Sequence, residues 1–216
     1  MCDFITGIRQ EKHHVLIVVN EDESIKIDRY LYQERPLSIG EPIDLREYLE
    51  WLQLHQYPHA MNDVIRFLAT RARSILEVRQ KLISKGYNEQ LIDLVLYKLE
   101  KEGLIDDEQF AREWIRTRIQ RQYGSTRILW ELKRKGVCDA TAAQSLAQVL
   151  NDIKGDTDND MIVLLAGKML RRVRNEPDSN KAVRKVLSAM VRRGFSYQDA
   201  NAAIQAALTM TSNEKA

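Results

Sequence analysis

Apolar residues recur at helical spacing through most of the chain after about residue 60. They stand at positions i, i+3, i+4 and i+7, which places them along one face of an α-helix. Breaks in this pattern divide the region into expected helices over 60–71, 74–85, 89–102, 107–121, 125–135, 139–151, 160–174, 180–193 and 197–208. The pattern therefore predicts a mainly α fold.

Three of the breaks share one sequence context. A glycine follows a helix and precedes an apolar residue at Gly86, Gly136 and Gly194. This arrangement is typical of a left-handed helix C-cap after which the next residue packs back on the last turn. A large apolar residue stands four positions before each glycine, at Leu82, Leu132 and Met190. The recurrence predicts three tandem three-helix modules in an elongated curved array, over 59–105, 106–151 and 160–210.

Residues 1–58 form a different segment. The β-branched run HHVLIVV at 13–19, the polar NEDES and the alternating SIKI predict a small β-hairpin. The prolines and glycine of RPLSIGEPID interrupt regular structure before a helix expected near Asp44. Pro58 is expected to break that helix. The sequence thus predicts an N-terminal β-hairpin plus helix extension.

Two further segments are expected to be a linker between modules and a C-terminal tail. Residues 152–159 carry several aspartates and few apolar residues, which favours an acidic linker before the third module. Residues 211–216 are expected to be a disordered tail. At the start of the 139–151 helix Cys138 replaces the capping residues Asn88 and Ser196 of the other modules, so we expect Asp139 to cap instead.

Composition and motifs narrow the function classes. The hydrophobic fraction of 44% suits packed cores, and the chain has no apolar run of membrane-spanning length and no signal segment, which favours the cytoplasm. Cys2 and Cys138 lack partners at zinc-site spacing, and Pro58 separates His55 from His59. No catalytic motif is present, and Asp106-Asp107 suits a helix start. We expect a non-enzymatic protein without metal or cofactor.

Charge is segregated along the chain although the net charge is only +2. Residues 1–58 carry eleven acidic and six basic side chains, whereas 109–137 carry eight basic and two acidic, and 168–194 nine and two. Such asymmetry indicates a basic surface on the later modules, offered to an anionic partner. The alternative for any one of these cations is an ordinary solvated helix face.

Helical phase places many of these cations opposite the apolar stripe. The candidate partner- or DNA-binding residues are Arg112, Arg116, Arg121, Arg127, Lys133, Arg134, Lys135, Arg171, Arg172, Lys181, Arg184, Lys185 and Arg192. Their partner is expected to be a phosphate backbone or an acidic protein surface. Trp114 and Tyr87 fall in core phase, whereas Trp130 lies off the main stripe and is the better candidate for an exposed contact.

The runs GLIDDEQFAREWIRTR, YGSTRILWELKRKGV and VRRGFSYQDANAAI resemble the repeat signatures of the bacterial RecX family, regulators of the RecA recombinase. The resemblance spans about 60–208. It implies a non-enzymatic, mainly inhibitory modulator that binds RecA–DNA filaments and suppresses ATP hydrolysis and strand exchange in recombination, DNA repair and the SOS response. It also implies weak nonspecific DNA binding. We expect a monomer that has no membrane partner.

One function of a different class stays open. Trihelical modules also occur in helix-turn-helix proteins, so a free-standing DNA-binding protein is the alternative. That alternative predicts sequence-selective binding to duplex DNA without RecA, whereas the RecX resemblance implies only weak, salt-sensitive binding to DNA alone.

Overall fold

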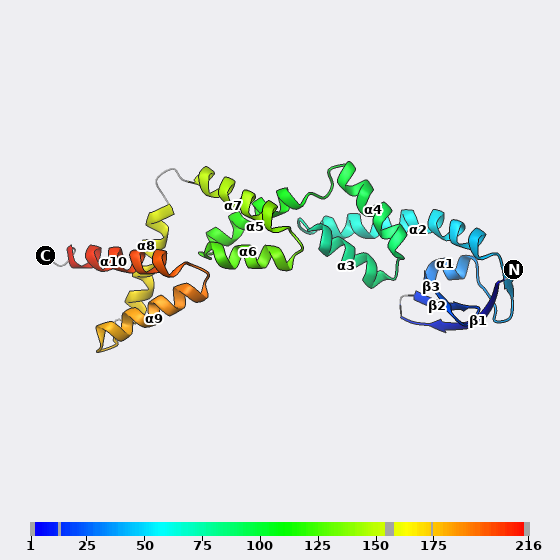
Figure 1. Ribbon diagram of the computed structural model, residues 1–216, viewed down its shortest axis with the longest axis horizontal. Helices are drawn as coiled ribbons and strands as arrows, with labels where there is room; N and C mark the ends of the chain where they lie inside the picture. Colours follow the sequence, from blue (N-terminus) through cyan, green and yellow to red (C-terminus); the bar gives the residue numbers. More distant parts are fainter. Residues whose placement is uncertain (1–2, 13, 154–157, 174, 214–216) are drawn as a thin grey trace. The chain divides into compact units, whose positions relative to one another are not determined.

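A computed structural model describes residues 3–12, 14–153, 158–173 and 175–213 (Figure 1). Over these residues the chain forms ten helices and four strands, so the expectation of a mainly helical fold with a small N-terminal β-structure is confirmed. The chain divides into two compact units, Met1–Asp106 and Asp107–Ala216. The elongated, curved arrangement of the three modules stays a prediction.

The first unit begins with a four-stranded antiparallel sheet of order β3-β2-β1-β4. Its strands are β1 Asp3–Gln10, β2 His14–Val19, β3 Glu23–Asp28 and β4 Pro42–Ile43. The expected hairpin corresponds to β2 and β3, but the prediction missed β1 and β4. In β1 only Ile5 is buried, and the pairing with β2 shifts between Ile5 and Gly7, so the period-two signal of a strand is weak there.

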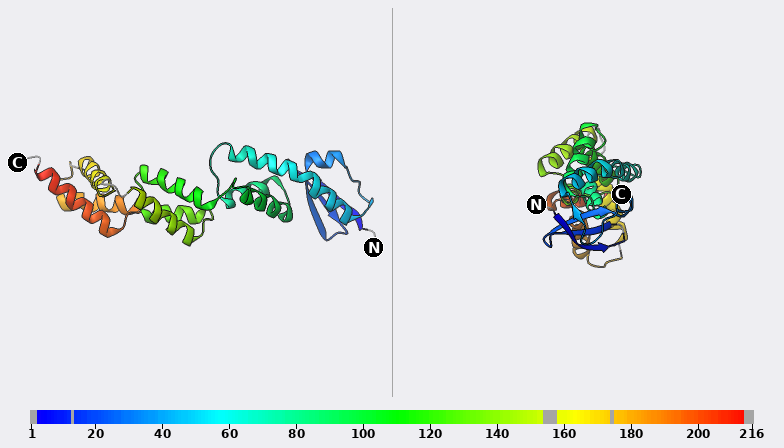
Figure 2. Two further views of the ribbon diagram at one scale, coloured as in Figure 1. Left: turned by 90° about the horizontal axis from the view of Figure 1, so that it is seen from above. Right: turned by 90° about the vertical axis from the view of Figure 1, so that its right-hand side faces the viewer.

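Two helices complete the core of this sheet. Helix α1, Arg29–Glu34, and helix α2, Leu45–Leu68, lie beside the sheet (Figure 2). They contribute Leu31, Tyr48 and Leu52 to the apolar cluster that contains the inward-facing strand residues. Pro58 lies inside α2, so the expectation that it breaks the helix was wrong. Pro58 and Leu54 are both exposed, and water can therefore hydrate the Leu54 carbonyl that proline leaves without a donor.

The second half of α2 joins α3, Ile75–Lys85, and α4, Glu89–Lys101, in the first module. Gly86 takes φ 92° at the end of α3, and the Asn88 side chain accepts a hydrogen bond from the Leu91 amide, as the sequence predicts. Tyr87 is buried and its hydroxyl donates to Asp63 at 3.1 Å. Burial raises the pKa of Tyr87, and the nearby Asp63 carboxylate raises it further. The tyrosine therefore stays neutral and serves packing.

Helix α3 begins with a capping box, and this gives a first prediction. The Ser74 hydroxyl accepts from the Glu77 amide at 3.2 Å, and Glu77 accepts from the Ser74 amide at 3.4 Å. Because Ser74 is fully buried, Ser74→Ala should lower the free energy of unfolding by about 1 kcal/mol. Urea denaturation followed by far-UV circular dichroism measures this. Ser84→Ala, at an exposed position of the same helix, is the control, and equal stability of both variants would refute the assignment.

The second unit holds the other two modules. The second module consists of α5 Asp107–Gln120, α6 Ser125–Arg134 and α7 Asp139–Ile153, and the third of α8 Asp158–Arg172, α9 Ser179–Arg192 and α10 Tyr197–Asn213. Each has its own apolar cluster. Leu132 and Met190 are fully buried, and Gly136 and Gly194 have φ 84° and 92°, so the recurrent positions do the same work in every module.

Three local expectations need correction. The Cys138 sulfur lies 3.4 Å from the Thr141 amide and stands before α7, so Cys138 itself takes the capping position and Asp139 pairs with Lys133. Part of the expected linker 152–159 is helical, because α7 extends through Ile153 and α8 begins at Asp158, while 154–157 lie outside the described residues. Helix α10 extends to Asn213, and the rest of the expected tail, 214–216, also lies outside.

Candidate partner-binding surface

The cations singled out by the sequence all lie in the second unit. They are carried by α5, α6, α8 and α9 or by the residues that directly follow α5 and α6. Helix α9 has no acidic residue over its whole length, and the single acidic residue of α6 is Glu131. Both helices are therefore basic along their sequence, and the side-chain contacts decide how much of this charge remains available.

Six of the thirteen candidates are engaged in ion pairs. The pairs are Arg112–Glu108, Arg116–Asp152 at 3.3 Å, Arg127–Glu131 at 3.1 Å, Lys133–Asp139 at 3.1 Å, Lys181–Glu176 at 3.5 Å and Lys185–Glu176. Lys135 lies over the Trp114 ring, with its ammonium nitrogen 4.3 Å from the ring centroid. The six ion-paired cations already have acidic neighbours within the chain, which reduces the charge they offer to a partner.

The other six candidates are exposed arginines that form no ion pair with any residue the structure describes. We call them the free arginines: Arg121, Arg134, Arg171, Arg172, Arg184 and Arg192. On α9, Arg184 and Arg192 lie on the side opposite the buried Val186 and Met190. An uncompensated guanidinium attracts carboxylates and phosphates and forms bidentate hydrogen bonds with them. The free arginines are the part of the predicted surface that retains this capacity.

Glu131 is the centre of a structural cluster that the sequence did not indicate. Its carboxylate accepts hydrogen bonds from Arg118 at 2.5 Å and from Arg127 at 3.1 Å. The Arg118 and Arg127 guanidinium groups also cover the rings of Trp114 and Tyr123, at 4.0 and 4.3 Å. Burial alone would raise the pKa of Glu131, but the hydrogen bonds and charges of the two arginines outweigh it and the pKa lies below its ordinary value. Arg127 is therefore a packing residue as much as a surface cation.

The start of α6 meets the end of α9 backbone to backbone. The Gly124 amide donates to the Arg193 carbonyl at 2.9 Å, and the Thr126 amide donates to the Gly194 carbonyl at 3.2 Å. Amides at a helix start and carbonyls at a helix end have no partner inside their own helix, so each end satisfies the other. Their partial charges are also opposite, which favours the contact. We call this contact the α6–α9 junction.

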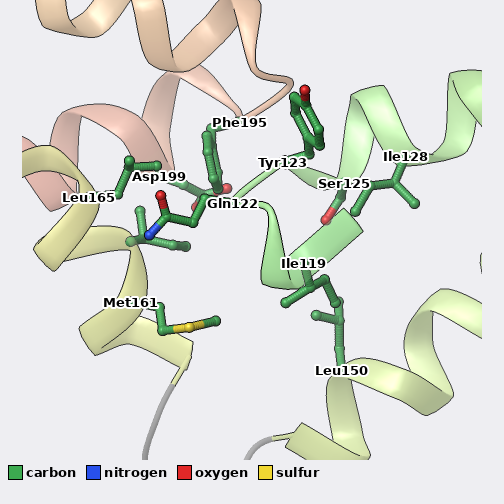
Figure 3. Close-up of a pocket in the computed structure, with 12 residues that line it drawn as sticks. Ile119, Gln122, Tyr123, Ser125, Ile128, Leu150, Met161, Leu165, Phe195 and Asp199 are labelled. Carbon is green, nitrogen blue, oxygen red and sulfur yellow. The ribbon is translucent and has the colours of Figure 1, made fainter. Parts of the chain in front are cut away.

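A cavity of about 240 Å³ lies beside the junction (Figure 3). Ile119 and Leu150 enter it from the second module, and Met161, Leu165 and Phe195 enter it from the third. Its acidic group, Asp199, accepts a hydrogen bond from the Ser196 hydroxyl at 2.6 Å at the start of α10. The lining is mainly apolar, with Gln122, Ser125 and Asp199 as polar members, and the cavity lies where the second and third modules pack together.

The described residues also bear on metal binding and membrane insertion. Among these residues no three or more histidine, cysteine or acidic side chains come together in a way that would hold a metal ion. No described helix combines the length and apolar character needed to cross a membrane. His55 instead stacks on Trp51, with ring centroids 4.7 Å apart, and His59 packs on Tyr30.

Comparison with known proteins matches two of the three modules directly. The family model described as the first three-helix domain of RecX matches residues 60–99, and that of the second three-helix domain matches residues 106–146. The crystal structure of RecX from Lactobacillus salivarius has the same fold, with a TM-score of 0.63 at 24% identity, over 71% of this chain and 97% of that one. A second crystal structure, of regulatory protein RecX, gives a TM-score of 0.62 at 22% identity over 91% and 96%.

Curated relatives extend the match along the sequence. Regulatory protein RecX of Mycobacterium sp. (strain KMS) is 38% identical over 136 residues, which cover 61% of this chain and 72% of the relative. That of Clostridium tetani is 24% identical over 192 residues, covering 88% and 87%. The repeated helix pattern and these matches agree, and the chain belongs to the RecX family of regulatory proteins.

Proposed function

We propose that this chain inhibits the RecA recombinase by binding RecA–DNA filaments through the free arginines of the second and third modules. Suppression of ATP hydrolysis and strand exchange would then limit recombination and DNA repair. The observation that carries the proposal is the set of six exposed arginines without an ion pair among the described residues, on a chain of a regulatory family. A filament presents both phosphates and carboxylates, and guanidinium groups bind either.

The contacts of α6 weigh against the form of the helix-turn-helix alternative in which α6 is the recognition helix. In a helix-turn-helix protein the first residues of the recognition helix enter the major groove and read base edges. Here the start of α6 is occupied, because the Gly124 and Thr126 amides bind the end of α9. We propose that any binding to DNA alone is weak, nonspecific and salt-sensitive, and that the protein acts as a monomer.

The test is inhibition of RecA on single-stranded DNA. With the cognate RecA, substoichiometric protein should slow ATP hydrolysis and strand exchange and should sediment with the filament. No inhibition and no association with the filament would refute the proposal. Sequence-selective binding to duplex DNA in the absence of RecA would favour the helix-turn-helix alternative.

A charge-reversal variant tests the surface itself. Arg134→Glu, Arg184→Glu and Arg192→Glu together should weaken filament binding about tenfold or more at low salt, and the loss should shrink as salt increases. Arg127 and Lys185 are left unchanged because their ion pairs belong to the fold. Filament sedimentation measures the binding, and circular dichroism should show unchanged helical content.

The matched control changes the charge of the first unit by the same amount. Arg46→Glu, Arg66→Glu and Lys101→Glu alter exposed positions of α2 and α4, which the proposal does not use. If the control weakens filament binding as much as the test variant, net charge rather than the free arginines governs association.

A further inference from the structure

Trp130 differs from the other tryptophans of the chain. Trp51 and Trp114 are half-buried and pack against apolar clusters, whereas Trp130 on α6 is 55% exposed. It lies on the face of α6 opposite the buried Ile128 and Leu132. An exposed indole ring does not contribute the large hydrophobic stabilisation that its burial would give. Exposed tryptophans are therefore frequently contact residues for a partner.

The surroundings of Trp130 are cationic. The Arg134 guanidinium, one helical turn further on, lies 4.8 Å from the centroid of the indole ring and forms no ion pair with a described residue, whereas the neighbouring Lys133 is paired with Asp139. The only carboxylate of α6, Glu131, is held by Arg118 and Arg127. The exposed face of α6 therefore combines an aromatic surface with positive charge.

This combination fits single-stranded nucleic acid better than an acidic protein surface. Bases of a single strand have free π-faces that stack on indole rings, and the adjoining phosphates bind guanidinium and ammonium groups. The bases of a duplex are already stacked on one another and leave no free face for the indole ring. The carboxylates of an acidic protein surface would bind the cations but would not contact the ring. We propose that Trp130 and Arg134 form a site for single-stranded nucleic acid, in which a base stacks on the indole ring and the Arg134 guanidinium binds the adjoining backbone phosphate.

The stacking site refines the proposed function, because it assigns part of the contact with the filament to its nucleic acid. In that respect it rests on the proposal that the chain binds RecA–DNA filaments. It does not depend on RecA for its test. Binding of the full-length protein is measured by fluorescence anisotropy with a labelled oligothymidylate and with an abasic oligomer of equal length, which carries the same phosphates and no bases.

The wild-type protein should prefer the base-bearing oligomer about tenfold, in line with the free energy of stacking one base on an aromatic ring. Trp130→Ala should abolish this preference and leave binding of the abasic oligomer unchanged. Trp130→Phe should keep most of the preference, and Trp130→Leu, which is apolar without a π-face, should lose it. Arg134→Gln should weaken both oligomers and lower the salt dependence of binding by about one phosphate contact.

Tyr97→Ala is the matched control. Tyr97 is an aromatic residue on α4 that is 60% exposed, so its loss removes a comparable ring from another surface. It should leave both affinities unchanged. Circular dichroism should show that the exposed-site variants stay folded.

The proposal is overturned if the wild-type protein does not distinguish the two oligomers, or if Trp130→Ala keeps the preference. It is also overturned if Trp130→Leu behaves as wild type, because an apolar protein contact would then explain the residue. RecA inhibition is measured on the same variants. Base preference without RecA inhibition would refute the proposed function and support the stacking site, and inhibition with no base preference would do the reverse.

Discussion

Gly124→Ala should release the third module from the second without unfolding either. A Cβ atom at Gly124 would lie 2.2 Å from the backbone carbon and oxygen of Gly194, and backbone atoms cannot move aside as a flexible side chain can. The φ of −81° and ψ of 161° at Gly124 are ordinary for any residue, so the effect comes from the contact alone. Loss of the two junction hydrogen bonds should cost roughly 2 kcal/mol of module docking.

Hydrogen exchange measures the release. The amide of Thr126 should exchange faster in Gly124→Ala, while amides in the middle of α9 and α10 stay protected. Gly167→Ala is the matched control in α8, because its Cβ would meet only the Ala207 Cβ, at an ordinary 3.8 Å. That control should be neutral or slightly stabilising, since alanine favours helix more than glycine does. If the two variants have the same exchange pattern, the junction does not hold the modules together.

The sequence predicted the modules because their signals are local. A glycine at a helix end, an apolar residue after it and a core residue one turn before it all act within six positions, and Gly86, Gly136 and Gly194 have the left-handed φ that this context requires. Strand β1 has no such local signal. Its pairing depends on β2 and β4 on either side of it, and most of its residues are at least partly exposed.

The candidate surface was predictable as a sum of charges but not as a set of contacts. The Arg112–Glu108 and Arg127–Glu131 pairs follow helical i, i+4 spacing and were within reach of sequence reasoning. The neutralisation of Lys185 by Glu176 requires a bond across the loop before α9, and the Arg118–Glu131 pair joins two helices. The α6–α9 junction joins residues about seventy positions apart, and Gly124 has no unusual backbone angle to indicate its role.

The modular fold also determines how far a core mutation acts. The apolar cluster around Leu82 and the cluster around Leu132 share no residue, and they belong to different units. In repeat proteins, stability is approximately a sum of the stabilities of the modules and of the contacts between neighbours. A cavity in one cluster should therefore destabilise its own module and leave distant helices protected.

Leu132→Ala should accordingly lower the stability of the second module by about 2–5 kcal/mol, because Leu132 is fully buried and its truncation leaves a cavity in the apolar cluster that also contains Phe110, Ile128 and Val149. Native-state hydrogen exchange should show faster opening of α5, α6 and α7 and unchanged protection of α3 and the sheet. Lys133→Ala, at the exposed neighbouring position, should cost less than about 1 kcal/mol through its surface ion pair with Asp139. If Leu132→Ala instead lowers protection equally in α3 and α6, the two clusters unfold as one cooperative unit, and the effects of mutations in one module cannot be assigned to that module alone.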